Sequence, residues 1–295
     1  MPRVLISDKM SGLAAEVFQR RGIEVDVKTG LSPEDLSAII GDYDGLAVRS
    51  STKVRGPVIE AATNLKVIGR AGIGVDNVDL NAATAKGIVV MNTPFGNSIT
   101  TAEHAIAMLM ALARDIPLAN ASTHAGKWEK SRFMGVEITG KVLGIIGCGN
   151  IGSVVADRAQ GLKMRVIAFD PYLGEDRATE LGVEKVTLDE LLARADFISL
   201  HTPLIDATRH IIDAAALAKT RKGVRLINCA RGGLVDEAAL KAALDSGHVA
   251  GAAIDVFEEE PATQSPLFGM EQVVATPHLG ACWTGRCPTR STCRR

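Results

Sequence analysis

Residues 142–152 read Val-Leu-Gly-Ile-Ile-Gly-Cys-Gly-Asn-Ile-Gly. The apolar half fits a buried strand, the G-x-G-x-x-G spacing of Gly147, Gly149 and Gly152 fits a tight turn, and the residues that follow fit a helix. The first glycine permits the turn, the second lets the backbone approach a pyrophosphate, and the third lets the helix pack closely on the strand. The start of the helix would present N–H groups and the positive end of its dipole to the phosphates. We therefore expect a dinucleotide-binding βαβ unit at residues 142–170.

Asp170 indicates which dinucleotide this unit binds. It ends the next expected strand, where an acid is expected to accept hydrogen bonds from the ribose hydroxyls. At about 4 Å and an effective dielectric of about 20, its charge would repel a 2′-phosphate by about 4 kcal/mol per unit charge. This repulsion would lower the affinity for NADP by about two orders of magnitude or more. The next residues, Pro171-Tyr172, supply no arginine to offset it. The pattern predicts NAD, and the alternative is a structural glycine turn with Asp170 as a surface acid.

The composition excludes several other classes of function. The 295 residues favour about two domains, with 46% apolar and 23% charged residues. Because the chain has 33 basic and 34 acidic residues, its net charge is close to zero, and we expect neither nucleic acid nor an anionic membrane as partner. No run approaches the roughly 18 apolar residues of a membrane helix. Cys148 and Cys229 lie in separate apolar runs, which is typical of a reduced, cytoplasmic protein.

Strand and helix patterns alternate along the chain, which predicts the α/β class with parallel sheets covered by helices on both faces. The expected strands are residues 4–6, 24–27, 45–48, 66–68, 88–90, 142–146, 165–169, 197–200, 224–228 and 251–254. A helical run extends from Ser98 to about Ala121, and we expect Pro117 to kink it or end it early. We place the boundary between two doubly wound domains in the turn-rich segment before Ser98, giving domains of residues 1–97 and 98–281.

Three groups at expected strand ends could carry chemistry. Arg231 follows a buried strand, so its guanidinium should project from the carboxyl edge of the sheet, where it could grip a substrate carboxylate. His278 follows another strand and could take a hydroxyl proton near neutral pH. One acid of the triplet 258–260 could hold the far ring nitrogen. The alternatives are an ordinary histidine and a solvated acidic loop. We interpret His104, on the long apolar helix, as a packing or subunit-contact residue.

Together these residues resemble the D-2-hydroxyacid dehydrogenases. The resemblance rests on the glycine turn and on His201-Thr-Pro-Leu, Asn228-Cys-Ala-Arg-Gly-Gly, Asp255-Val-Phe-Glu-Glu-Glu-Pro and Pro277-His-Leu-Gly-Ala. It extends into the first domain through Ala47-Val-Arg-Ser-Ser-Thr and Val67-Ile-Gly-Arg-Ala-Gly-Ile-Gly-Val-Asp-Asn-Val-Asp, where it points to members that act on 3-phospho-D-glycerate. It implies a substrate-binding domain at residues 1–97 and a Rossmann NAD-binding domain at 98–281.

The resemblance implies roles for individual residues. Arg231, Glu260 and His278 would be catalytic, Glu260 being the acid directly before proline. The implied cofactor contacts are Gly147, Gly149, Asn150, Ile151, Gly152, Asp170, Thr202, Pro203, Cys229, Ala230, Arg231, Asp255, His278 and Gly280. Arg49 and Arg70 would bind a substrate phosphate, with backbone N–H groups of Gly72, Ile73 and Gly74 near the carboxylate. Either arginine could instead close a loop through an ion pair.

The implied reaction is oxidation of 3-phospho-D-glycerate with NAD, the first step of serine biosynthesis. Within the same chemistry the alternative is a glyoxylate or hydroxypyruvate reductase. From another class it is a non-catalytic, NAD-responsive binding protein. We expect a homodimer or higher homo-oligomer through the NAD-binding domain, and no metal.

The last residues, 282–295, differ in character from the rest. They contain four arginines, no acids and three cysteines, Cys282, Cys287 and Cys293, and they show no helical apolar period. We interpret them as a short disordered end after a disrupted reading frame, lacking the helix that the resemblance implies would return to the first domain. Its loss would reduce or abolish activity. A zinc site that combines the three cysteines with His278, and a basic RNA-binding tail, are the alternatives.

Overall fold

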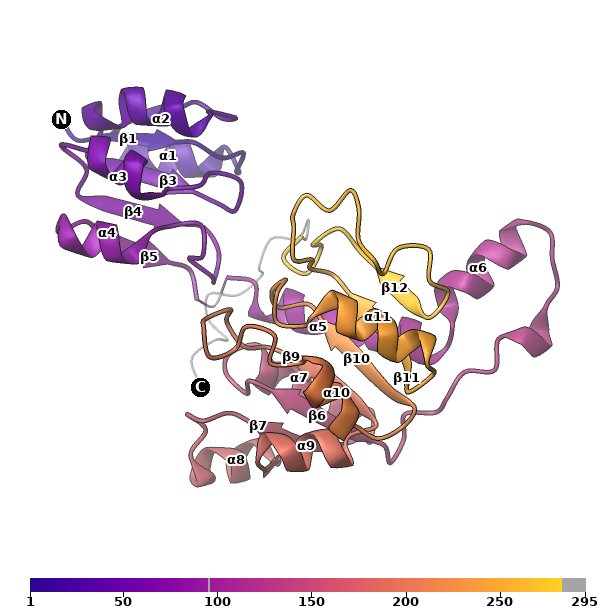
Figure 1. Ribbon diagram of the computed structural model, residues 1–295. Helices are drawn as coiled ribbons and strands as arrows, with labels where there is room; N and C mark the ends of the chain where they lie inside the picture. Colours follow the sequence, from indigo (N-terminus) through magenta and orange to yellow (C-terminus); the bar gives the residue numbers. More distant parts are fainter. Residues whose placement is uncertain (95, 283–295) are drawn as a thin grey trace. The chain divides into compact units, whose positions relative to one another are not determined.

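A computed structural model of the chain describes residues 1–94 and 96–282 (Figure 1). The chain divides into two compact units, of which the first is Met1–Asn97 and the second begins at Ser98. Each unit is built on one parallel sheet, so the predicted α/β class with two parallel sheets is confirmed. The expected tail residues 283–295 lie outside the described residues, and only Cys282 of that segment is described. Among the described residues, no helix combines the length and the apolar character needed to cross a bilayer.

The first unit has five strands in the order β2-β1-β3-β4-β5. The strands are β1 (Arg3–Ile6), β2 (Glu24–Val27), β3 (Gly45–Val48), β4 (Val67–Arg70) and β5 (Val89–Asn92). The helices are α1 (Leu13–Arg20), α2 (Pro33–Ile39), η1 (Ile40–Asp42), α3 (Gly56–Ala61) and α4 (Leu80–Ala85). Because parallel crossovers are right-handed, α1 lies on one face and α2, α3 and α4 lie on the other.

One face of this first sheet carries exposed apolar side chains at β5. The chain moves outward from β1 to β2 through α1 and then back across the sheet, so α1 packs near β2 only. Val90 packs against the core under α2–α4, whereas its neighbours Val89 and Met91 point the other way and are 57% and 58% exposed. Among residues 1–94 and 96–282, Val89 and Met91 are thus exposed apolar side chains on the face of the sheet opposite α2–α4.

The second unit has seven strands in the order β12-β11-β10-β9-β6-β7-β8. The strands are β6 (Val142–Ile146), β7 (Arg165–Phe169), β8 (Glu184–Lys185), β9 (Phe197–Leu200), β10 (Val224–Asn228), β11 (Val249–Ile254) and β12 (Val273–Ala275). The helices are α5 (Ser98–Ala113), α6 (Ile116–His124), η2 (Lys130–Arg132), α7 (Gly152–Gly161), α8 (Glu175–Leu181), α9 (Leu188–Arg194), α10 (Ala214–Lys219) and α11 (Glu237–Asp245). The strand order reverses between β6 and β9, which is where a doubly wound sheet binds its ligand.

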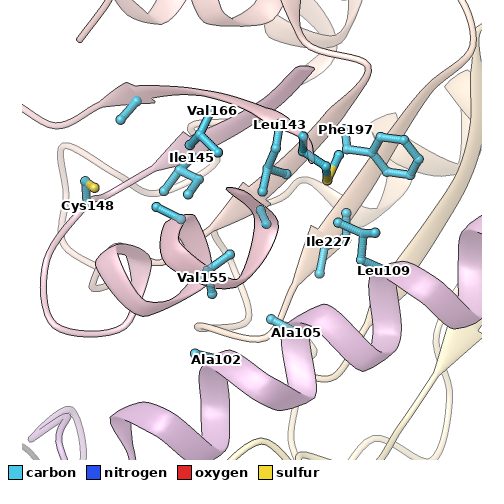
Figure 2. Close-up of a cluster of buried hydrophobic side chains, with 14 of the residues drawn as sticks. Ala102, Ala105, Leu109, Leu143, Ile145, Cys148, Val155, Val166, Phe197 and Ile227 are labelled. Atoms are coloured by element: carbon cyan, nitrogen blue, oxygen red, sulfur yellow. The ribbon is translucent and has the colours of Figure 1, made fainter. Parts of the chain in front are cut away.

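Two apolar cores fill the two faces of the second sheet. One lies under α5, α7 and α8, and the other lies under α9, α10 and α11. Figure 2 shows Ala102, Ala105 and Leu109 of α5 turned toward the strand residues Leu143 and Ile227. The small side chains of Ala102 and Ala105 let α5 approach α7 and the sheet closely. The helix also packs against β11 and β12, and so lies beside the loops that follow these strands.

The long helix expected from Ser98 to about Ala121 is two helices. The interruption falls at Asp115, whose φ of 52° is left-handed, and not at Pro117. Proline lies in the first turn of α6, where its missing N–H costs no intrahelical hydrogen bond. The expectation that Pro117 ends the helix is wrong, because this proline begins the next one.

Candidate cofactor and active site

The glycine turn between β6 and α7 has the geometry that its spacing predicts. Gly147 has a φ of 89°, and a Cβ on it would lie 2.8 Å from the carbonyl of His201 and 2.9 Å from the Thr202 nitrogen. A Cβ on Gly152 would overlap the Gly147 carbonyl oxygen, so only glycine lets α7 start this close to the turn. A Cβ on Gly149 would meet no atom within 4 Å. The space beside Gly149 is therefore open to a ligand, while its two neighbours are required by the fold.

The start of α7 and the end of β7 fit a dinucleotide. Ile151, the N-cap residue of α7, makes no side-chain cap hydrogen bond, and the Ser153 N–H donates to the Gly149 carbonyl at 3.0 Å. The positive end of the α7 dipole therefore lies at the glycine turn, where it favours a pyrophosphate. Asp170 accepts hydrogen bonds from the Cys148 N–H at 2.9 Å and from the Tyr172 N–H at 2.8 Å. A carboxylate has about four acceptor positions, so Asp170 can accept ribose hydroxyls as well. Asn150 and Ile151 lie within this turn, as expected.

The segment after β9 closes the turn from the other side. The His201 N–H donates to the Ile146 carbonyl at 2.8 Å, which sets Thr202 against Gly147. The Pro203 carbonyl accepts from the Thr208 hydroxyl at 2.6 Å. Burial lowers the pKa of His201 to about 4, so this imidazole is neutral at physiological pH. The expected contacts Thr202 and Pro203 thus lie at the switch point of the sheet.

Arg231 lies in a turn directly after β10. Asn228 shapes the turn: its side-chain amide donates to the Arg231 carbonyl at 2.9 Å, and its Oδ1 accepts from the Ala230 N–H at 3.1 Å. The Arg231 guanidinium donates to the Ala230 carbonyl at 2.6 Å. A Cβ on Gly232 would overlap the Phe257 carbonyl, so the arginine turn lies directly against the loop that carries the acidic triplet.

Within that triplet, Glu260 is the acid that reaches the histidine. Its Oε2 lies 2.7 Å from His278 Nδ1, and its Oε1 accepts from the Phe257 N–H at 3.2 Å. Burial raises the pKa of the Glu260 carboxyl, but the His278 and Phe257 hydrogen bonds and the charges of His278 and Arg231 lower it more, so the net pKa lies below its ordinary value. Glu258 instead lies 3.2 Å from His210. The structure thus brings Arg231, Glu260 and His278 together at the carboxyl edge of the sheet.

The loop that carries His278 is held by Asp255. His278 has a left-handed φ of 54°, which is unfavourable for a residue with a side chain unless its surroundings enforce it. Its N–H donates to the Asp255 carbonyl at 2.8 Å. The Asp255 carboxylate accepts from the N–H groups of Leu279 at 2.7 Å and Gly280 at 2.8 Å. Asp255 exposes none of its surface, so its side chain supports the loop from inside.

Two residues of this support were not recognised in the sequence. The Thr276 hydroxyl donates to Asp255 Oδ1 at 2.5 Å, and His104 Nε2 lies 3.3 Å from the same oxygen. The interpretation of His104 as a packing residue missed this polar contact, because its partner is far away in the chain. The available signal was a histidine within an apolar helix, a position where a buried polar group needs a partner. Cys229 is buried beside Asp255, and burial and that charge raise the pKa of its thiol.

In the first unit, Arg49 and Arg70 lie at neighbouring strand ends. Val48 of β3 pairs with Arg70 of β4, so Arg49 directly follows the same edge. A Cβ on Gly72 would overlap the Arg70 guanidinium, which therefore lies over this glycine. The N–H of Gly72 donates to the Arg70 carbonyl at 3.0 Å. The two expected phosphate ligands thus share one edge with the Gly72–Gly74 turn.

A buried polar group shapes the Arg49 segment. The Asp8 carboxylate, 4% exposed, accepts from the Arg49 N–H and from the Thr52 N–H and hydroxyl. The Asn77 amide donates to the carbonyls of Arg49 at 2.8 Å and Thr52 at 2.7 Å. Asp8 was not recognised from the sequence, where the available signal was an acid two residues after the first strand.

Profiles of one family match both units of this geometry. The D-isomer specific 2-hydroxyacid dehydrogenase NAD binding domain matches residues 106–280, and the catalytic domain of the same family matches residues 4–189. The chain therefore belongs to the D-isomer specific 2-hydroxyacid dehydrogenase family, as the resemblance implied, and contains its NAD binding domain.

Individual relatives are similar over nearly the whole chain. D-3-phosphoglycerate dehydrogenase of Archaeoglobus fulgidus is 49% identical, and that of Sus scrofa is 51% identical, each over 95% of this chain. The matches cover 53% and 52% of those relatives, so the chain spans about half their length. A solved glyoxylate reductase from Paecilomyes thermophila has a TM-score of 0.87 at 32% identity, covering 95% of this chain and 88% of that one.

Proposed function

We propose that the protein oxidises 3-phospho-D-glycerate to 3-phosphohydroxypyruvate with NAD, as the first step of serine synthesis. The observation that carries the proposal is the 2.7 Å contact between His278 Nδ1 and Glu260 beside Arg231. The sequence identity of 49% and 51% to D-3-phosphoglycerate dehydrogenases supports the choice of 3-phospho-D-glycerate as substrate. When bound, NAD supplies the hydride acceptor.

The arrangement of these side chains explains how the substrate hydroxyl could lose its proton and how the substrate carboxylate could be bound. Glu260 is a carboxylate, so it accepts a hydrogen bond from the Nδ1–H of His278 and favours the tautomer in which Nε2 carries no proton. Nε2 can then take the hydroxyl proton as the C2 hydrogen leaves as hydride. The carboxylate of Glu260 stabilises the imidazolium that forms. We assign Arg231 to the substrate carboxylate, because a guanidinium binds a carboxylate through two parallel hydrogen bonds.

The phosphate specificity is assigned to the first unit. Arg70 ends β4 and Arg49 directly follows the neighbouring β3, and two cations at one sheet edge favour a dianion over a neutral group. The Gly72 amide already donates within the unit, so we place the carboxylate contact of this turn on the amides of Ile73 and Gly74. Glyoxylate and hydroxypyruvate carry no phosphate and would not use the two arginines.

The first experiment measures NADH consumption with 3-phosphohydroxypyruvate, hydroxypyruvate and glyoxylate. We expect the phosphorylated substrate to have the highest kcat/KM. His278→Gln should lower kcat by about 10²- to 10⁴-fold. His210→Gln is the matched control, because His210 pairs with Glu258 in the same region but outside the site. Equal rates for all three substrates would favour the reductase. NAD binding without NADH consumption, the same in the wild type and in His278→Gln, would favour an NAD-responsive binding protein.

The second experiment tests the phosphate contacts. Arg49→Gln and Arg70→Gln should each raise KM for 3-phosphohydroxypyruvate by about tenfold or more, because each removes a charged hydrogen-bond donor. KM for hydroxypyruvate should stay the same. Lys53→Gln, an exposed cation nearby, is the control. If both substrates respond equally, the arginines act on the fold rather than on the phosphate.

We also propose the setting in which the enzyme acts. Trp128 and Met134 of the second unit are 88% and 82% exposed, which supports a homo-oligomer that buries them. Cys148 and Cys229 are free thiols, which supports the cytoplasm as compartment. Sedimentation of the wild-type chain and of Trp128→Glu tests the first point.

A further inference from the structure

Asp255 is a buried carboxylate whose oxygens are already engaged. Oδ1 accepts from the Leu279 N–H at 2.7 Å and from the Thr276 hydroxyl at 2.5 Å, and Oδ2 accepts from the Gly280 N–H at 2.8 Å. A charge that exposes none of its surface is costly unless every lone pair is satisfied. His104 Nε2 lies 3.3 Å from Oδ1, within ion-pair distance of this group, and it shares a 3.3 Å hydrogen bond with Thr276 Oγ1.

The contacts of His104 determine which ring nitrogen carries the proton. Nε2 lies 3.3 Å from Asp255 Oδ1 and 3.3 Å from Thr276 Oγ1. The Thr276 hydroxyl hydrogen is directed to Asp255 at the shorter distance of 2.5 Å, so Thr276 presents only lone pairs to the ring. Nε2 therefore faces two acceptors and must be protonated. His104 is thus the donor toward Asp255 and Thr276, and Asp255 in turn holds the loop of residues 278–280.

His104 can hold this loop because its own helix is fixed. Ala102 and Ala105, on either side of it in α5, are buried in the core of the second unit (Figure 2), whereas the His104 side chain is 20% exposed. Asp255, at the end of β11, links this rigid helix to the backbone of residues 278–280. Those three residues include His278 in its unfavourable left-handed conformation.

We propose that His104 is a positioning residue for His278: its Nε2–H holds the Asp255–Thr276 pair, and Asp255 holds the backbone that aims the His278 ring at Glu260. The inference rests on the proposed function for the role of His278. A metal site is the competing reading, because the ligand atoms of His104, Cys229 and Asp255 lie within 4.8 Å of one another. A cation there would have to displace the three donors that Asp255 already accepts.

The test uses His104→Leu, which removes the donor, and His104→Gln, which retains an N–H at similar reach. Glu103→Gln, an exposed neighbour on the same helix, is the matched control. We expect His104→Leu to lower kcat with 3-phosphohydroxypyruvate by about tenfold, the effect of losing the hydrogen bond to Thr276, with KM little changed. His104→Gln should recover most of kcat. Equal damage in both variants, or an unchanged kcat in His104→Leu, would overturn the proposal.

A second measurement does not depend on turnover. Amide hydrogen exchange at Leu279 and Gly280 should be faster in His104→Leu than in the wild type and in Glu103→Gln, because these N–H groups donate to Asp255. Unchanged exchange at these two amides would overturn the proposal for His104. An inactive wild-type chain would refute only the proposed function, because the exchange measurement does not need turnover. Exchange that slows on adding Zn²⁺ to the wild type, and not to His104→Gln, would also overturn it in favour of the metal.

Discussion

His201→Gln tests the burial of a titratable ring beside the glycine turn. The His201 Nε2 lies 2.8 Å from the Ser199 hydroxyl, whereas its buried Nδ1 has no hydrogen-bond partner among residues 1–94 and 96–282. A protonated ring would need acceptors at both nitrogens. Burial therefore favours the neutral form and lowers the pKa of His201 from 6.5 to about 4. Glutamine can contact Ser199 without titrating.

The size of the effect follows from the two pKa values. The unfolded chain binds a proton below about pH 6.5 and the folded chain only below about pH 4, so the contribution of His201 to stability is present above 6.5 and lost as the pH falls. The wild type should lose about 2 kcal/mol between pH 8 and pH 5 through this side chain, and about 3 kcal/mol in all. His201→Gln should not show this loss.

Two measurements check the reasoning. Histidine Hε1 resonances, followed by NMR between about pH 8 and pH 4, should include one that stays neutral to near pH 4 and is absent from His201→Gln. Urea unfolding, followed by circular dichroism at about pH 8 and pH 5, should give a larger pH-dependent loss in the wild type. A His201 resonance with its midpoint near pH 6.5, or equal losses in both proteins, would refute the argument.

Three further predictions concern the cofactor turn and the catalytic pair. Gly149→Ala should weaken NAD binding without lowering thermal stability. Gly152→Ala, whose Cβ would overlap a carbonyl, should also destabilise the fold by about 1–3 kcal/mol. Titration calorimetry measures the NAD affinity, and scanning calorimetry measures the thermal stability. Asp170→Ser should reduce the preference for NADH over NADPH by about tenfold or more in a comparison of kcat/KM, and an unchanged ratio would contradict its role. Because the pKa of Glu260 is lowered, the stability it contributes is present above its ordinary value of 4.5 and lost as the pH falls, so wild type should lose more stability than Glu260→Gln in urea unfolding below pH 4.5.

The parts of the fold that the sequence predicted are those determined by local patterns. The strand at residues 142–146 and the next at 165–169 were predicted to the residue, since apolar runs end there in a glycine turn and an acid. Local patterns were misleading where two conformations suit the same residues. Pro117 can end a helix or begin one, and the left-handed Asp115 that decides between them has no sequence signal as strong as glycine.

The polar contacts of the candidate site were harder to predict than its strands. The triplet 258–260 contains three chemically equivalent acids, and only the course of the backbone brings Glu260 rather than Glu258 to His278. His104 and Asp255 lie on segments far apart in the chain, and no spacing rule joins them. Their contact depends on α5 packing across β11 and β12, which is a property of the tertiary fold.

Glycines explain how these distant loops come close enough to act together. Gly232 directly follows Arg231 in the turn after β10. In the structure a side chain there would occupy the space of the Phe257 carbonyl, so the arginine turn and the Glu260 loop touch backbone to backbone. Likewise, a Cβ added to Gly280 would lie only 3.1 Å from Asp255 Oδ2. The catalytic side chains project from loops whose separation is set by backbone contact and by the Asp255 side chain, which joins the Glu260 loop to the backbone of residues 279–280. This is why the hydrogen bond between His278 and Glu260 can be short.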